Sequence, residues 1–140
     1  MDNNKRLSYL TSEIDMIYHE AARKLGVSDS VMRILYAICL NGESASLSDI
    51  VQLSGIRKQT INSALRKLEQ SGAVETDGGK KKQVRLTQSG KRLAEQTAMR
   101  VLGVEHEIFD AWTKEELEQY VELTEKFCTA FQKKIKELSI

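Results

Sequence analysis

Residues 48–86 constrain the fold of this chain more than any other segment. Their pattern predicts a short helix, a tight turn at Ser54-Gly55, a second helix over residues 57–71 and a hairpin with lysines at its tip. The second helix has two chemically distinct sides. Its apolar side must pack inward and consists of Ile61, Ala64, Leu65 and Leu68. Its opposite side carries Gln59, Ser63, Arg66 and Gln70, flanked by Asn62 and Lys67.

The outer side of this helix differs from an ordinary solvated surface. A solvated helix usually carries paired Glu and Lys side chains, whereas here the only acid is Glu69, away from the polar side. Amides, a hydroxyl and a guanidinium can hydrogen-bond base edges and phosphates in the major groove of duplex DNA. The pattern therefore favours a DNA-reading helix over a solvated helix that has no partner.

Charge is segregated along the chain, although its net value is only +1. Between Arg57 and Arg85 there are eight bases and three acids, a balance of +5. Between Glu105 and Glu125 there are eight acids and one base, a balance of −7. Such segregation favours a polyanionic partner for the first segment alone.

The remaining pattern predicts a mainly α (α+β) fold. Helices are expected over residues 5–25 and 29–40, from Ser46 as a cap, over 88–112 with a bend or close contact at Gly103, and from the capping box at Thr113 onward. Residues 74–76 and 84–86 alternate as a two-stranded hairpin. Arg57 occupies the cap position of the second helix and is a poor cap, so that first turn needs tertiary contacts or a phosphate.

The two ends of the chain carry narrow apolar stripes. In the first helix they are Leu7, Leu10, Ile14, Ile17 and Ala21, and in the last Leu117, Val121, Thr124, Cys128, Phe131, Ile135 and Leu138. Their alternating spacing of three and four residues is typical of helix–helix seams. We therefore expect a homodimer formed by the helices within residues 1–27 and 88–140, around a DNA-binding region at 28–87. The alternative is an intramolecular bundle in a monomer.

The order of these elements resembles the MarR family of transcriptional regulators. The resemblance is carried by Gly55-Ile56-Arg57-Lys58-Gln59-Thr60-Ile61-Asn62-Ser63-Ala64-Leu65-Arg66-Lys67-Leu68-Glu69, by Ser71-Gly72, and by Val84-Arg85-Leu86-Thr87-Gln88-Ser89-Gly90. It implies a homodimer with a winged helix-turn-helix in each arm and a pseudo-palindromic operator as partner. It further implies a regulator, here expected to be a repressor, released by a small aromatic anion bound between the dimerisation helices and the DNA-binding lobe.

Candidate site residues follow from both lines of reasoning. We expect DNA contacts from the helix, its flanks and the wing: Ser46, Arg57, Lys58, Gln59, Thr60, Asn62, Ser63, Arg66, Lys67, Lys80, Lys81, Lys82 and Arg85. Of these, Gln59, Asn62, Ser63 and Arg66 are expected to read bases. The aromatic and polar candidates for the effector cleft are Tyr18, Tyr36, His106 and Trp112, although such aromatic residues on apolar stripes more often belong to the core.

The predicted wing departs from the family pattern. The family's wing usually carries an Asp-x-Arg motif, in which the acid braces the arginine. The positions of this motif correspond here to Gly78-Gly79-Lys80, so the acid–arginine brace is absent there and three lysines occupy the tip instead. A lysine is a flexible point charge and reads groove geometry less sharply than arginine. We expect this wing to add salt-sensitive phosphate attraction more than sequence selectivity.

Several other classes of protein are disfavoured. No apolar run is long enough for a membrane span and the first residues lack a signal-peptide pattern, so a cytoplasmic protein is expected. The two cysteines, Cys39 and Cys128, are expected to be buried thiols, and neither histidine has a partner at metal-ligand spacing. No cofactor is predicted, and no paired carboxylates or nucleophile–base spacing indicates an enzyme. A winged-helix protein-interaction module and a constitutive DNA-binding protein remain as alternatives.

Overall fold

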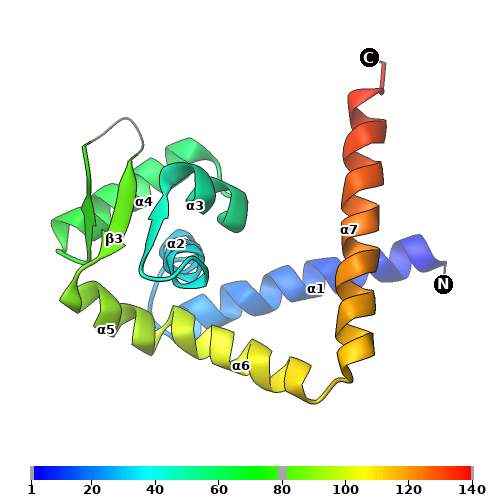
Figure 1. The fold of residues 1–140 in the computed structure, drawn as a ribbon, viewed down its shortest axis with the longest axis horizontal. Helices are drawn as coiled ribbons and strands as arrows, with labels where there is room; N and C mark the ends of the chain where they lie inside the picture. The colour runs from blue at the N-terminus through cyan, green and yellow to red at the C-terminus, as the bar shows by residue number, and fades with distance from the viewer. Residues whose placement is uncertain (1, 79–81, 140) are drawn as a thin grey trace. The chain divides into compact units, whose positions relative to one another are not determined.

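The structure is a computed structural model that describes residues 2–78 and 82–139. The chain divides into two compact units, Met1–Leu102 and Gly103–Ile140. The first contains α1 (Asn3–Lys24), α2 (Asp29–Leu40), β1 (Ser44–Ser46), α3 (Leu47–Ser54), α4 (Lys58–Gln70), β2 (Val74–Thr76), β3 (Gln83–Leu86), α5 (Gln88–Gln96) and the start of α6 (Ala98–Asp110) (Figure 1). The second contains the rest of α6 and α7 (Lys114–Lys136). The predicted mainly α class with a small wing is confirmed.

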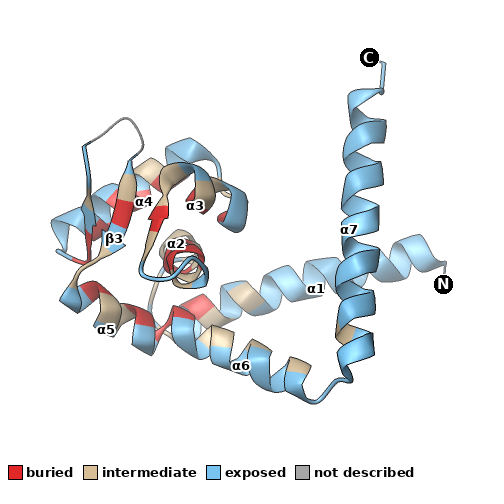
Figure 2. Ribbon diagram, viewed as in Figure 1, coloured by how far each residue is buried: buried red, intermediate tan, exposed pale blue. Residues whose placement is uncertain are grey.

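The core of the first unit lies between α2, α3, α4 and the sheet. Ile34 and Ile38 of α2, Ile50 of α3, Ile61 of α4 and Val84 of β3 are completely buried within it. In Figure 2 the buried positions lie in these elements, along α5 into the start of α6, and near the end of α1. The whole predicted inward side of α4 is buried, which fixes the opposite side of that helix toward solvent.

The sheet has three antiparallel strands in the order β1-β3-β2. The predicted hairpin is present, with Val74 opposite Leu86 and Thr76 opposite Val84. The third strand, β1, in which Ala45 pairs with Val84, was not predicted from the sequence. Because β1 runs directly into α3, it ties the base of the wing to the helix-turn-helix.

The turn between α3 and α4 is set by Ser54 and Gly55. Gly55 has φ +67°, a left-handed conformation that glycine adopts without steric cost. The Ser54 hydroxyl accepts a hydrogen bond from the Ile56 amide at 3.2 Å. Arg57 caps α4 without a side-chain hydrogen bond, as predicted, so donors in the first turn of α4 lack a side-chain acceptor at its cap.

The junction between β3 and α5 explains the Thr87-Gln88-Ser89-Gly90 motif. The Thr87 amide donates to the Ala73 carbonyl at 3.0 Å, and the Thr87 hydroxyl accepts from the Gly90 amide at 3.1 Å. A Cβ at position 90 would overlap the Ala73 carbonyl oxygen. Gly90 is therefore needed for the close approach of α5 to the chain that leads into β2.

The helix predicted over residues 88–112 is interrupted, which corrects the sequence expectation. The break lies at Thr97, with φ −127° and ψ −91°, whereas Gly103 lies inside α6, with no atom within 4 Å of an added Cβ. The buried Thr97 hydroxyl donates to the Leu93 carbonyl at 2.7 Å. This local bond gives the backbone an alternative to continuing the α-helix.

Most of the apolar stripe of α1 and of that of α7 is exposed in the single chain, and most of each helix is pale in Figure 2. Leu7, Ile17, Val121, Phe131 and Ile135 keep between 52% and 60% of their surface exposed. In the second unit, the predicted Thr113 capping box is present, and Trp112 packs at 5.0 Å from Phe109 and 5.5 Å from Tyr120, measured between ring centroids. None of the helices in the described residues has the length and apolar character of a membrane span.

Candidate nucleic-acid interface

The outward side of α4 presents polar side chains to solvent. Gln59, Ser63 and Arg66 are exposed, and Asn62 is half-buried. Because Ile61, Ala64, Leu65 and Leu68 hold the other side in the core, this polar row has a fixed direction. It includes hydrogen-bond donors and acceptors of the kinds that read base edges.

A groove of about 1050 Å³ opens at the first turn of α4, bounded by the start of α3 and the base of the wing. It brings together four of the predicted DNA-contact residues: Ser46, Lys58, Asn62 and Lys82. Ser48, Gln52 and Gln83 also line it and were not predicted. Their positions in short polar stretches gave no periodic signal, and they lie together where β1 pairs with β3 beside the start of α3.

A second hollow of about 410 Å³ lies between α4 and the beginning of α2. It gathers the predicted residues Gln59, Thr60, Ser63 and Lys67. Ser28, the N-cap of α2, and Ser30 within α2 line the same hollow and were not predicted to do so. The Ser28 hydroxyl also accepts a hydrogen bond from the Val31 amide at 3.2 Å. The polar side of α4 is thus flanked on each side by hydroxyl and ammonium groups, an arrangement that suits two phosphate backbones.

The wing contains an ion pair between an acid and an arginine that was not predicted from the sequence. Arg85 of β3 lies 2.7 Å from the Asp77 carboxylate, beyond β2, and 3.7 Å from that of Glu75. The brace therefore joins the two sides of the hairpin instead of falling on residues 78–80. Arg85 remains exposed, but two acids share its charge, so it has less to offer a phosphate than Lys82. Lys80 and Lys81 lie outside the described residues.

A separate pocket of about 250 Å³ lies in the first unit, lined by α1, α2, the end of α3 and the start of α6. Two of the predicted effector residues, Tyr18 and Tyr36, line it, with ring centroids 6.4 Å apart in an edge-to-face arrangement. His106 and Trp112, the other two, belong to the second unit.

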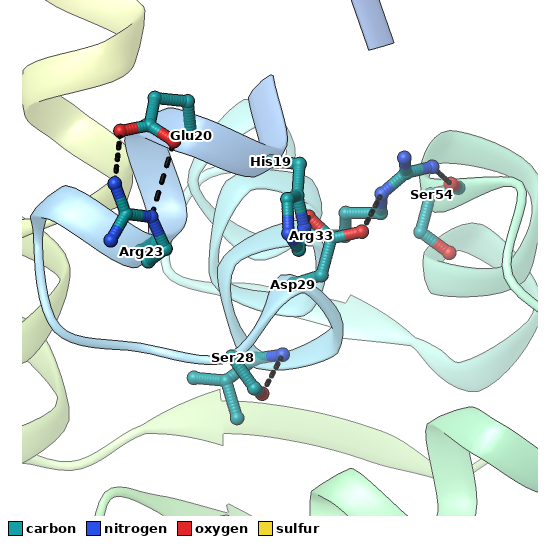
Figure 3. A network of polar contacts seen from close by, with 8 residues as sticks. His19, Glu20, Arg23, Ser28, Asp29, Arg33 and Ser54 are labelled. Carbon is teal, nitrogen blue, oxygen red and sulfur yellow. Dashed lines mark hydrogen bonds and ion pairs between the residues drawn. The ribbon is translucent and has the colours of Figure 1, made fainter. Parts of the chain in front are cut away.

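Arg33 connects this pocket to the turn that precedes α4 (Figure 3). Its Nε lies 3.6 Å from an Asp29 oxygen, and its Nη1 donates to the Ser54 carbonyl at 3.4 Å. His19 of α1 approaches the other Asp29 oxygen at 3.5 Å. A chain of polar contacts thus runs from α1 through α2 to the residue before Gly55.

The cysteines lie in different environments, so the expectation that both are buried is wrong for the single chain. Cys39 is half-buried in α2, and burial raises the pKa of its thiol, which keeps it protonated and unreactive. Cys128 is exposed on the apolar stripe of α7. Within residues 2–78 and 82–139, no three His, Cys, Asp or Glu side chains are grouped to hold a metal ion.

These features define a winged helix-turn-helix protein with an exposed recognition helix. The sequence of residues 25–83 matches the model of the MarR family. The match covers the helix-turn-helix and the wing up to the start of β3, and solved MarR family regulators share the fold of the chain beyond that segment. The resemblance to the MarR family is confirmed, and the fold is that of a MarR family transcription regulator.

Three of these solved structures are similar over most of their length. A MarR family regulator from Neisseria meningitidis is 18% identical, with a TM-score of 0.86 over 98% of this chain and 99% of that one. BpsR of Bordetella bronchiseptica is 18% identical, with a TM-score of 0.65 over 88% and 98%; its DNA binding is regulated by 6-hydroxynicotinic acid. NadR in complex with 4-hydroxyphenylacetate is 18% identical, with a TM-score of 0.69 over 91% and 92%. No curated protein sequence matches the chain.

Proposed function

We propose that this protein is a homodimeric, sequence-specific DNA-binding transcription regulator, acting as a repressor, whose grip on DNA a small molecule modulates. The observation that carries the proposal is the polar side of α4, held outward by a buried apolar side and flanked by the two hollows. A helix presented in this way fits the major groove of B-form DNA, with flanking groups on the phosphates.

Base reading and phosphate attraction are assigned to different residues. Arg66 is exposed at the middle of the polar side and is proposed to contact base edges, where a paired guanine contributes roughly 1–3 kcal/mol of discrimination. Lys58 and Lys82 line the wing-side groove and are proposed to contact phosphates. The uncapped first turn of α4, beside Arg57 and Lys58, offers backbone donors to a phosphate as well.

The dimer is proposed from the exposed apolar stripes of α1 and α7. Monomeric soluble proteins rarely leave large contiguous apolar patches in water, and these two stripes have the spacing of helix seams. A second copy of the chain, carrying the same stripes, is the proposed cover. Two copies would then offer two recognition helices to half-sites about one helical turn apart.

The effector site is proposed at the pocket that Tyr18 and Tyr36 line. BpsR and NadR, which share the fold, are regulated by or bound to small aromatic compounds. Arg33 borders this pocket and touches the Ser54 carbonyl, two residues before Ile56 and close to the start of α4. A ligand whose binding separates Arg33 from the Ser54 carbonyl would alter the turn that positions α4. Such a ligand acts only through a difference in affinity for the two arrangements.

DNA binding is tested by fluorescence anisotropy on duplexes that flank the coding region, compared with random duplexes over a range of salt. Arg66→Ala should reduce the ratio of operator to random affinity by roughly tenfold or more. Lys82→Ala should lower both affinities together and flatten the salt slope by about one unit. Lys133→Ala, which removes the same charge from α7, is the control and should leave the ratio unchanged. Equal losses on both duplexes for Arg66→Ala would contradict its reading role.

Repression is tested with a reporter under the promoter that the operator overlaps. Deletion of the protein should raise expression, and lowered expression would indicate an activator. A protein that binds none of these duplexes at modest salt would instead favour a protein-interaction role for the winged helix.

A further inference from the structure

The pocket beside Tyr18 and Tyr36 carries an unbalanced negative charge. Its charged lining residues are Asp15, Asp29 and Arg33, which gives a formal balance of −1. Asp29 is already opposed by Arg33 at 3.6 Å, with His19 3.5 Å from its other oxygen. Asp15 of α1 forms no ion pair with any residue in the described ranges. Asp15, an exposed residue of α1, is thus the unpaired charge in the lining of this pocket.

The rest of the lining suits a small ring. Met32, Leu53 and Val101 supply apolar contacts, and Tyr18 and Tyr36 supply two aromatic rings inclined at 75°. The volume of about 250 Å³ lies just below the usual range for ligand pockets, about 300–1000 Å³. This space admits one aromatic ring with a short arm.

Charge decides which arm the pocket prefers. A carboxylate brought next to Asp15 meets a like charge and finds Arg33 already engaged with Asp29 and the Ser54 carbonyl. An ammonium group meets an opposite charge at Asp15, and aromatic faces attract cations as well. Two unit charges about 4 Å apart in a solvent-like dielectric change an affinity roughly fivefold in either direction. The difference between a cation and an anion of the same shape is therefore roughly tenfold or more.

We infer that this pocket binds a small aromatic cation, a single ring bearing a protonated amine, in preference to an aromatic acid. The aromatic acids meant are of the kind of 6-hydroxynicotinic acid, which regulates BpsR, and 4-hydroxyphenylacetate, which is bound in NadR. The inference rests on the proposed function only for the role of the pocket in regulation, because ligand selectivity is measured without DNA.

The test uses tyramine and 4-hydroxyphenylacetate, which share a hydroxyphenyl ring and carry opposite charges. Isothermal titration calorimetry on the full chain without DNA should show tyramine binding at least tenfold more tightly. In Asp15→Asn this preference should fall by roughly tenfold or more, because the lost charge attracts the cation and repels the anion while the shape is kept. Glu13→Gln removes the same charge from α1 at a position that does not line the pocket, and its preference should match that of the unaltered protein.

Three results would overturn the inference: tighter binding of 4-hydroxyphenylacetate, equal preferences in the unaltered protein and Asp15→Asn, or no binding of either probe at millimolar concentration. None of them bears on DNA binding, which the anisotropy measurements test independently. Conversely, tyramine selectivity in a protein that binds no duplex would support the ligand class and refute the regulatory role.

Discussion

Removal of a single ring from the α7 stripe should weaken the proposed dimer severely. Phe131 is 52% exposed in the single chain, and a phenylalanine side chain has about 200 Å² to bury, so about 100 Å² is left for a partner to cover. At about 25 cal/mol per Å², this area is worth about 2.5 kcal/mol. An alanine side chain would still bury part of this area, so the substitution removes about 2 kcal/mol of dimer stability per copy. In a symmetric dimer both copies lose it, so Phe131→Ala should raise the dimer dissociation constant about a thousandfold.

The dissociation constant of the dimer is measured by fluorescence-detected sedimentation over a concentration series, with circular dichroism to confirm that α7 stays helical. Gln119→Ala is the matched control, because Gln119 lies on α7 away from the apolar stripe; its constant should stay within a few fold of the unaltered value. If Phe131→Ala dimerises as tightly as the control, the stripe of α7 is not the interface and the burial argument is wrong.

Three further predictions concern stability and reactivity. Gly90→Ala should lower the free energy of unfolding by about 1–3 kcal/mol, because the added Cβ would overlap the Ala73 carbonyl. Gly103→Ala, which places a methyl group in open space within α6, should raise the free energy of unfolding by up to about 1 kcal/mol. Denaturant unfolding monitored by circular dichroism compares the two variants. Thr113→Ala removes the capping box of α7 and should cost about 1 kcal/mol in the same assay, and no loss would show that the cap is dispensable. Cys39 has a pKa raised by burial, so its thiolate fraction at pH 7 is depressed and its alkylation should need higher pH; Cys128 should react quickly in a dissociated chain and slowly in the dimer, as mass spectrometry after iodoacetamide treatment would show.

The parts of the fold that follow from local periodicity were predictable. The inward side of α4 and the Ser46 cap of α3 each depend on residues within one or two helical turns, and the structure has them as expected. The presence of the hairpin also follows, because residues on both strands alternate between apolar and polar side chains.

The parts that depend on distant partners were not predictable. β1 is three residues of small side chains, and only its pairing with β3 makes it a strand. The brace between Asp77 and Arg85 depends on the register of the hairpin, which places residues eight positions apart within 2.7 Å. The break at Thr97 has no proline or glycine to signal it, and a buried hydroxyl bonded to Leu93 accompanies it instead.

The candidate site also has a part that local periodicity predicts and a part that depends on distant residues. The outward residues of α4 could be identified because the helix has two contrasting sides, whereas Ser28 and Ser30 enter the candidate interface only through the packing of α2 beside α4. The charge of the effector pocket was likewise invisible in the sequence. Asp15, Asp29 and Arg33 meet there from two helices, and their balance emerges only when α1 and α2 are placed together.

Native mass spectrometry of the protein on its operator duplex addresses the central proposal most directly. With two half-sites one helical turn apart, the complex should hold two chains of 15.8 kDa, and insertion of half a turn between the half-sites should abolish the two-chain species. A complex that holds one chain, or two chains regardless of half-site spacing, would contradict the proposal that paired copies of α4 read a single stretch of DNA.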